Sequence, residues 1–222
     1  MGAAVAAAAV AVGIVAASLA ARRSRDWGST AAERSTSYPG DELIPEPADE
    51  VTRSVSIDAP PDVVWQWLVQ IGQDRGGLYS YDWLENLFGL DIHSAEEIRE
   101  EWQHLDVGDS VVLVPAGQLG LEDGYVLGVA AVEPDHHLVL RQAPPEHPWN
   151  AVWTFIIEPD GPGRSRLISR SRSELPQGKA AMLQRTLTAT MEPITSVMTR
   201  RMLLGIKARA EGSQPHEATS AR

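Results

Sequence analysis

The apolar positions of the chain first take the spacing of a strand. Between Thr52 and Asp58 they alternate with polar ones, and Val51, Val55 and Ile57 share one face. Alternation of this kind predicts a β-strand with one buried face.

A helix is predicted directly after this strand. Pro60 and Pro61 suit a first helical turn, where backbone N–H donors have no intrahelical partner, and Gly72 ends the segment. The apolar residues between them recur at helical spacing: Val63, Val64, Trp67, Leu68 and Ile71. Shorter helices are expected over Tyr81–Leu87 and after Ser94, whose side chain would cap a turn containing Glu96 and Glu97.

Five further strands are predicted in the second half of the chain. Each is short and bounded by Gly, Pro or Asp turn residues, which is typical of an antiparallel meander. They cover residues 109–114, 125–132, 138–142, 151–158 and 166–173.

The last periodic segment, residues 178–210, carries an apolar stripe at helical spacing. Pro193 lies inside it and should kink this helix or divide it in two. A sheet that is followed by one long helix can bury its apolar face only against that helix. The sequence therefore predicts an α+β fold, in which a curved antiparallel sheet of about six strands wraps around a long C-terminal helix.

Several segments resemble a known superfamily. The opening "SVSIDAPPDVVWQWLVQIG" is similar to the first strand and helix of the START-like helix-grip superfamily (SRPBCC; polyketide cyclase/dehydrase and lipid transport). "GLYSYDWLENLFGLDIHSAEEI" and "RRMLLGIKARAE" resemble an uncharacterised bacterial branch of it, and "WGSTAAERSTSYPGDELIPEP" resembles the arm before its domain. The resemblance covers residues 27–211. It implies a cavity between sheet and helix for a lipid, sterol, polyketide or hormone, and it supplies no catalytic motif.

Residues 3–21 are apolar except for Ser18 and are followed by Arg22, Arg23 and Arg25. A helix of this length spans about 28 Å, close to the hydrocarbon thickness of a bilayer. Because the arginines follow the stretch and none precedes it, the positive-inside rule places the rest of the chain in the cytoplasm. We expect a single-span anchor in the cell membrane, with a cleaved leader or a misassigned start as alternatives.

The domain organisation follows from these segments. Residues 22–50 are polar and rich in Pro and Gly, as in a linker or an arm laid over the domain, and residues 51–210 form the ligand-binding domain. Residues 211–222 are expected to be a disordered tail. The net charge of −11 disfavours nucleic-acid partners, and the absence of cysteine excludes disulfides and thiolate sites.

Aromatic residues are the main candidates for ligand contacts. Trp67, Tyr79, Tyr81 and Trp83 gather around the predicted helices that cover one end of the sheet, and Tyr125, Trp153 and Phe155 lie on strands. Tyr and Trp suit the lining of an apolar cavity, although ordinary core packing is the explanation that we favour for the group around the helices. Trp65 and Trp67 are two positions apart, so at least one of them should point away from the principal core.

Polar and flexible side chains within the apolar pattern are the other candidates. Arg141 and Glu192 are charges inside apolar periodicities, and Met191 lies on the helical stripe. Arg164, Arg166, Arg170 and Arg172 alternate along the last strand, where we expect a solvated outer face; Arg170 pointing inward onto a ligand carboxylate is the alternative. Outward arginines would turn the small Ser169 inward and leave room for a ligand.

The sequence predicts no metal site and no cofactor, because the histidines lack metal-ligand spacing and no phosphate-loop or nucleophile-elbow motif occurs. We expect binding of an apolar small molecule or lipid. A cyclase, dehydratase or hydrolase that uses Arg141, Glu192 or a cavity tyrosine is the alternative, and a regulatory interaction domain with a fully packed interior is a third.

Overall fold

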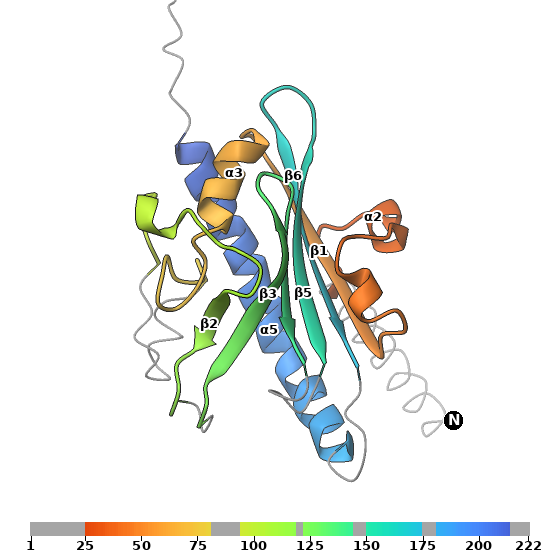
Figure 1. Ribbon diagram of the computed structural model, residues 1–222. Coiled ribbons are helices and arrows are strands. Elements are labelled where there is room, and N and C mark those ends of the chain that lie inside the picture. Colours follow the sequence, from red (N-terminus) through yellow and green to blue (C-terminus); the bar gives the residue numbers. More distant parts are fainter. Residues whose placement is uncertain (1–24, 81–93, 119–121, 144–149, 175–180, 214–222) are drawn as a thin grey trace, which may run out of the picture.

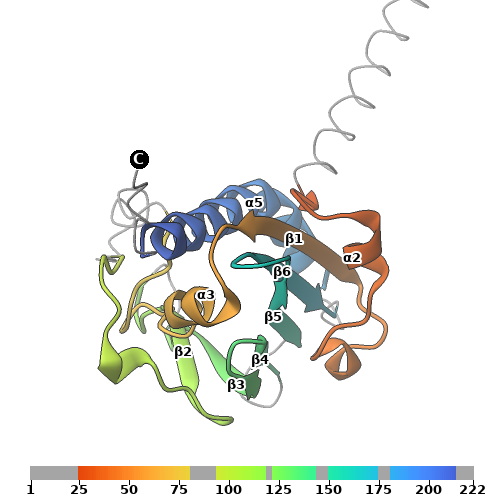
Figure 2. The ribbon, with the colours of Figure 1, turned by 90° about the horizontal axis from the view of Figure 1, so that it is seen from above.

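A six-stranded antiparallel sheet and one long helix form the body of the protein (Figure 1). The computed structural model describes residues 25–80, 94–118, 122–143, 150–174 and 181–213, and for 181–194 it describes only the helical backbone. Viewed from above, the helix crosses one face of the sheet, and the N-terminal arm lies on the other side (Figure 2). The predicted α+β helix-grip fold is confirmed.

All six predicted strands are present, and their order across the sheet is β1-β6-β5-β4-β3-β2, with every neighbouring pair antiparallel. Strands β2 to β6 are therefore a meander, and β1 completes it by pairing with the last strand. The strands are β1 (Asp49–Ile57), β2 (Ser110–Val114), β3 (Tyr125–Glu133), β4 (His137–Gln142), β5 (Ala151–Pro159) and β6 (Ser165–Ser173).

The described helices are fewer than the sequence suggests. They are α2 (Ala31–Ser35), α3 (Pro61–Leu68) and α5 (Ala181–Gly212), with short 3₁₀ turns η1 (Asp41–Leu43) and η2 (Glu100–Trp102). The prediction of a helix directly after Ser94 is wrong, because the first regular element after this residue is the 3₁₀ turn η2 at Glu100–Trp102. Pro193 does not divide α5, which is continuous.

Two predicted segments, the helix over 81–87 and the anchor over 3–21, lie outside the described residues. Within the described ranges, no helix is both long enough and apolar enough to cross a membrane.

Two register shifts bend the sheet. One lies between Val112 and Val114 where β2 pairs with β3, and the other between Val129 and Ala131 where β3 pairs with β4. An extra residue on one strand of a pair increases the local twist and bends that strand. The bends therefore fall in β2, β3 and β4, at the edge of the sheet opposite β1. Helix α5 packs on the β1 side.

The main core lies between the sheet and its helices. Helix α3 packs against α5 and against β5, and α5 also packs against β1. One continuous cluster of buried side chains fills this layer at the α3 end. Its members include Val64, Leu68, Leu138, Leu140, Phe155, Ile157, Leu167, Met202, Leu203 and Ile206.

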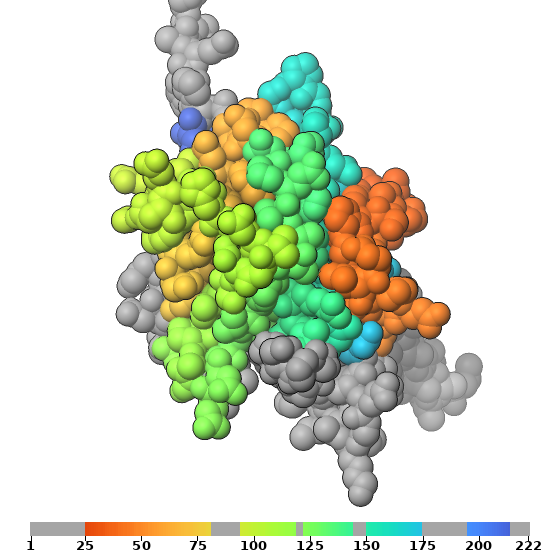
Figure 3. All heavy atoms as spheres, in the orientation of Figure 1, coloured from red at the N-terminus to blue at the C-terminus, as the bar shows by residue number. Residues whose placement is uncertain are grey.

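On the opposite face of the sheet, the N-terminal arm (residues 25–48) covers part of the surface, over β4, β5 and β6 (Figure 3). Tyr38 packs on Ile156 and Ile168, and Ile44 packs on Val139 and Val152. Each contact buries apolar surface that would otherwise face water on the outer side of the sheet.

At Gly40 the arm lies close against β4 and β5. Its φ is +91°, and a Cβ atom there would lie 2.7 Å from Val139 Cγ1 and 2.9 Å from Thr154 Oγ1. Only glycine combines this backbone conformation with so close an approach.

Arg170 is the centre of the arm contact. All five of its N–H donors are used: Nε donates to Thr52 Oγ1, Nη1 to Asp41 Oδ2 and the Thr36 carbonyl, and Nη2 to the Glu33 and Arg34 carbonyls. Its guanidinium carbon also lies 4.7 Å from the centre of the Tyr38 ring. The side chain is 2% exposed.

This placement corrects the sequence analysis in part. The arginines of β6 do point away from α5, as expected, but Arg170 is buried rather than solvated. The alternative, in which it points inward onto a ligand, is wrong. A buried guanidinium is stable here because every donor has an acceptor and Asp41 supplies the opposite charge at 2.7 Å.

Two neighbours of Arg170 extend the contact, and the three together are called here the arginine clasp (Arg166, Arg170 and Arg172). Arg166 Nε donates to Glu33 Oε1 over 2.6 Å, and Arg172 Nε donates to Glu50 Oε2 over 2.6 Å. Arg172 Nη1 also reaches the carbonyls of Asp41 and Ile44. The clasp therefore joins α2, η1 and β1 to one strand.

Replacing Arg170 by methionine should lower the free energy of unfolding by about 3–5 kcal/mol, because the buried Asp41 would lose its charge partner at 2.7 Å and keep the more distant Arg172 at 3.4 Å. Arg164→Met is the matched control: its partner Asp58 is exposed, and loss of an exposed pair costs less than about 1 kcal/mol. Urea unfolding monitored by circular dichroism measures both. Equal losses would contradict the structural role of Arg170.

The clasp should also weaken in acid. Burial alone would raise the pKa of Glu33, but hydrogen bonds from Arg166, the Thr30 N–H and Ser54, together with the charge of Arg166, lower the pKa to about 2. A carboxylate with a lowered folded-state pKa stabilises the fold above its unfolded pKa of about 4.3, and this contribution is lost as the pH falls toward 2. The Glu33→Gln variant should therefore be less stable than the wild type at pH 7. Urea unfolding should show that the difference in their free energies of unfolding becomes smaller below about pH 4.5. A difference that stays constant with pH would refute this.

Candidate functional site

The face of the sheet that looks toward α5 changes character along the strands. Residues directly opposite one another on neighbouring strands share a face and form rows across the sheet. The row of Val55, Leu167 and Ile157, near α3, is apolar and buried. Two rows further along, Ser171 lies beside Trp153, and beyond it Ser173, Ala151 and Gln142 share a row. We call this second region the open half of the interior, defined by Gln142, Trp153, Ser169 and Ser171.

Trp153 marks the boundary between the two regions. Its ring centre lies 4.6 Å from that of Phe155, and its Nε1 donates to Ser169 Oγ over 2.9 Å. Phe155 is fully buried, whereas Trp153, two residues earlier on the same face, is only partly buried, and Ser171 is exposed. Three of the predicted site residues (Trp153, Phe155 and Ser169) are thus brought together at one place.

The open half also contains buried polar side chains that the sequence analysis missed. Arg53 shares the row of Ser169, is 5% exposed, and donates from Nη2 to Ser196 Oγ of α5 over 2.8 Å. Gln142 is 1% exposed and donates to the Val126 carbonyl. Arg53 could have been found, because it occupies the same alternation as Val51 and Val55, which were placed on the buried face.

Trp67 and Tyr79 lie elsewhere, in the packed core beside α3. Their rings meet edge to face at 6.1 Å, and Trp67 Nε1 donates to Ser213 Oγ. Tyr79 is 1% exposed, its hydroxyl accepts from Gln70 Nε2 over 2.9 Å, and the Arg209 guanidinium lies 4.8 Å from its ring centre.

Burial raises the pKa of Tyr79 to about 12, so its hydroxyl stays protonated at neutral pH and cannot serve there as a base. The hydroxyl is already engaged with Gln70 within the core. These contacts give Tyr79 a packing role in the described structure.

The remaining predicted residues fall in three places. Tyr125 begins β3, is partly buried against the core, and has a pKa raised by burial. Arg141 shares the outer row of Val152 and donates to Asn150 Oδ1, so it lies on the side of the sheet that faces away from α5. The others, Tyr81, Trp83 and the side chains of Met191 and Glu192, lie outside the described residues.

The expectation that Trp65 or Trp67 would point away from the core is wrong. Trp65 is 7% exposed and Trp67 is 3% exposed, and both belong to the main cluster. Helix α3 is enclosed on more than one side, since Gln103 Nε2 donates to the Gln66 carbonyl and Gln70 Nε2 to the Glu97 carbonyl. Covering segments from a distant part of the chain leave no exposed face for either ring.

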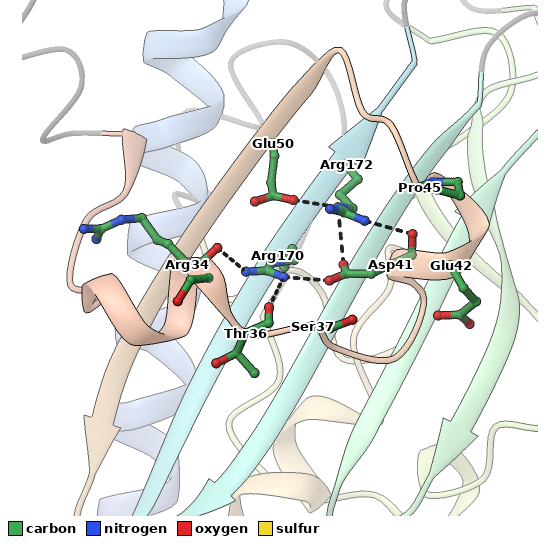
Figure 4. Close-up of a pocket in the computed structure, with 10 residues that line it drawn as sticks. Arg34, Thr36, Ser37, Asp41, Glu42, Pro45, Glu50, Arg170 and Arg172 are labelled. Atoms are coloured by element: carbon green, nitrogen blue, oxygen red, sulfur yellow. Dashed lines mark hydrogen bonds and ion pairs between the residues drawn. The ribbon is translucent and has the colours of Figure 1, made fainter.

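A shallow depression of about 370 Å³ lies on the outer surface, over the arginine clasp (Figure 4). Residues 34–37, Asp41, Glu42 and Pro45 of the arm line one side, and Glu50, Arg170 and Arg172 line the other. The donors of Arg170 are all used within the protein, and Arg172 is bonded to Glu50 and to backbone carbonyls. The depression is the seam between arm and sheet, and its arginines hold the arm in place.

Among the residues that the structure describes, no three His, Cys, Asp or Glu side chains converge as a metal ion would require. The described side chains of the open half offer hydrogen-bonding groups, one guanidinium and aromatic surface.

No protein-family model matches the chain, and no curated protein matches it. Among solved structures, it is similar to a protein from Thermobifida fusca (16% identity over 75% of this chain and 96% of that one, TM-score 0.46). It is also similar to a protein from Mesorhizobium loti (17%, 75% and 100%, TM-score 0.43) and to norcoclaurine synthase from Thalictrum flavum in complex with dopamine and hydroxybenzaldehyde (14%, 75% and 88%, TM-score 0.42). Similarity at this level carries no argument about activity.

The packing of Tyr79 against α5 yields a prediction. A Cβ atom on Gly205 would lie 2.4 Å from the Tyr79 carbonyl oxygen and 2.8 Å from Tyr79 Cβ. Gly205→Ala should therefore destabilise the fold by about 1–3 kcal/mol, although alanine ordinarily favours a helix over glycine by up to about 1 kcal/mol.

Gly212→Ala is the matched control in the same helix, because a Cβ atom there meets nothing within 4 Å. It should be neutral or slightly stabilising in thermal unfolding. A stabilised Gly205→Ala variant would refute the close contact.

Proposed function

We propose that the protein binds an apolar small molecule or lipid between the open half of the sheet and α5, and that residues 3–21 tether it to the cytoplasmic face of a membrane. The resemblance to the START-like superfamily first suggested this function, and the helix-grip arrangement is consistent with it. The described residues add a more specific argument.

The observation that carries the proposal is the partial exposure of Trp153. Its strand, β5, is an interior strand of the sheet, and its side chain is on the face that α5 covers. A large aromatic side chain at such a position is normally enclosed, as Phe155 is. An apolar ligand would cover the part of the Trp153 ring that remains exposed, next to the small and exposed Ser171.

The polar groups nearby restrict the kind of ligand. Ser169, Gln142 and Arg53 carry hydroxyl, amide and guanidinium groups on the same face. All three are buried and hydrogen-bonded within the protein, so a polar group of a ligand would share or replace these bonds. A few polar groups in a mostly apolar pocket fix the orientation of a ligand. The best fit is an elongated apolar molecule with one hydrogen-bonding or acidic end, such as a fatty acid.

The enzymatic alternative has less support. Of the groups suggested for acid or base catalysis, Arg141 lies on the outer face and Tyr79 is enclosed in the core with a raised pKa. A binding function requires neither.

Ser171→Trp tests the proposal by filling the space beside Trp153. Titration of the full-length protein in mild detergent with cis-parinaric acid, a fluorescent fatty acid, should give an affinity at least about tenfold lower for this variant, or about 1.4 kcal/mol. Glu158→Trp is the control, because Glu158 is exposed and its row contains Arg166 of the outer face. It should bind like the wild type.

Native mass spectrometry of the gently purified protein provides an independent measurement, since a bound lipid would add its mass. The proposal fails if the wild type neither carries a co-purifying molecule nor binds the probe. It also fails if the two tryptophan variants bind the probe equally well.

A further inference from the structure

The outward side of α5 and the start of the arm form a surface with an unusual composition. We call it the α5–arm face, and it consists of Trp27, Val197, Arg200 and Arg201. The chain as a whole carries a net charge of −11, yet residues 195–212 of α5 contain four Lys or Arg residues and one acid. This part of α5 thus has an excess of basic groups in an acidic protein.

Helical spacing places three of these residues together. Val197, Arg200 and Arg201 are separated by three and four positions, so they share one side of α5, while Met202, Leu203 and Ile206 are buried on the other. Val197 is 50% exposed, which is high for an apolar side chain on a helix that packs on a sheet. Both arginines are exposed.

Trp27 joins this surface from the arm. The Arg200 guanidinium carbon lies 4.8 Å from the centre of the Trp27 ring. The Trp27 backbone carbonyl accepts a hydrogen bond from Ser54 N of β1. The ring packs on the core with one side and carries an arginine on another, so apolar and cationic surfaces adjoin. Trp and Arg together suit the boundary between lipid headgroups and acyl chains.

The position of the face along the chain limits what it can meet. The apolar stretch ends at residue 21, and an extended chain advances at most about 3.5 Å per residue, so Trp27 lies within about 20 Å of residue 21. If residues 3–21 cross a bilayer, the domain cannot move far from its surface. The side of the domain beside residue 27 must then be close to the headgroups.

From this we infer that the α5–arm face docks on the surface of an anionic bilayer, with Val197 and Trp27 at the headgroup level and Arg200 and Arg201 against lipid phosphates. This inference rests on the tether in the proposed function and adds the orientation of the domain. The cytoplasmic leaflet carries a negative surface potential, which attracts basic residues next to a membrane segment. The opposite edge of the sheet, at β2, then faces away from the bilayer.

The absence of cysteine from the chain makes a direct test possible. Val197→Cys and, as control, Val107→Cys each introduce one thiol for the environment-sensitive dye NBD. Val107 is 66% exposed and lies three residues before β2, the strand at the far edge from β1. Full-length labelled protein is reconstituted into vesicles of phosphatidylcholine with or without phosphatidylglycerol.

With phosphatidylglycerol present, the dye at 197 should emit at shorter wavelength and be quenched by lipids brominated near the headgroup, and the dye at 107 should do neither. Adding Arg200→Glu to the 197 variant should weaken the phosphatidylglycerol-dependent quenching about fivefold or more. Equal behaviour of the two dyes overturns the inference, as does quenching at 197 that ignores both the lipid charge and Arg200→Glu.

The result is separable from the ligand-binding proposal, because cis-parinaric acid binding is measured in detergent without a bilayer. Arg200→Glu should leave that binding unchanged, since Arg200 lies on the outward side of α5. If the protein binds the fatty acid but the two dyes behave alike, the ligand-binding proposal is supported and the docking inference is refuted.

Discussion

The architecture depends on the burial of the Arg170 guanidinium in the middle of the outer face. A buried charge is costly unless every donor and the charge itself are matched, and here the acceptors come from three separate parts of the chain. Thr52 belongs to β1, Asp41 to the turn η1, and the three carbonyls to α2 and the residue that follows it. The arm can therefore take only the path that brings these groups together. With the arm in place, part of the outer face is covered as well as the inner one, and β1 is held from two sides.

The burial of Arg170 also makes the two faces of the sheet different in the way they use their side chains. The outer face uses its charged residues for structure, and the depression over the clasp is a consequence of that packing. The inner face is apolar near α3, where Phe155, Leu167 and the C-terminal half of α5 fill the space. It becomes polar and partly open near Trp153 and Ser171. Among the described residues, this second region combines exposed aromatic surface with buried polar side chains, where Trp153 donates to Ser169 and Arg53 donates to Ser196.

Much of the fold follows from local patterns in the sequence. The alternation of apolar residues located all six strands to within a few positions, since each strand has one face on a core, and the stripe of α5 marked the helix. The arm could not be predicted in the same way, because Tyr38 and Ile44 pack on strand residues that follow them by 95 to 130 positions. Arg170 was placed on the correct side of its strand, but its burial depends on those same distant contacts. Arg53 is the opposite case. Its position in the alternation of β1 indicated that it is buried, but a charged side chain is not expected on a buried face, so it was not predicted there.

Pairing between β1 and β6 has a consequence for how the protein is made. Arg170 and Thr52, which bond across this pair, are 118 positions apart, and Arg53 meets Ser196 over 143 positions. The meander from β2 to β6 closes through short connections, whereas β1 and the arm must wait until most of the polypeptide has left the ribosome. Contacts of such long range slow the search for the native topology. During synthesis, β1 would therefore present an unpaired edge for an extended time, which makes this strand the segment where an early encounter with a chaperone would matter most.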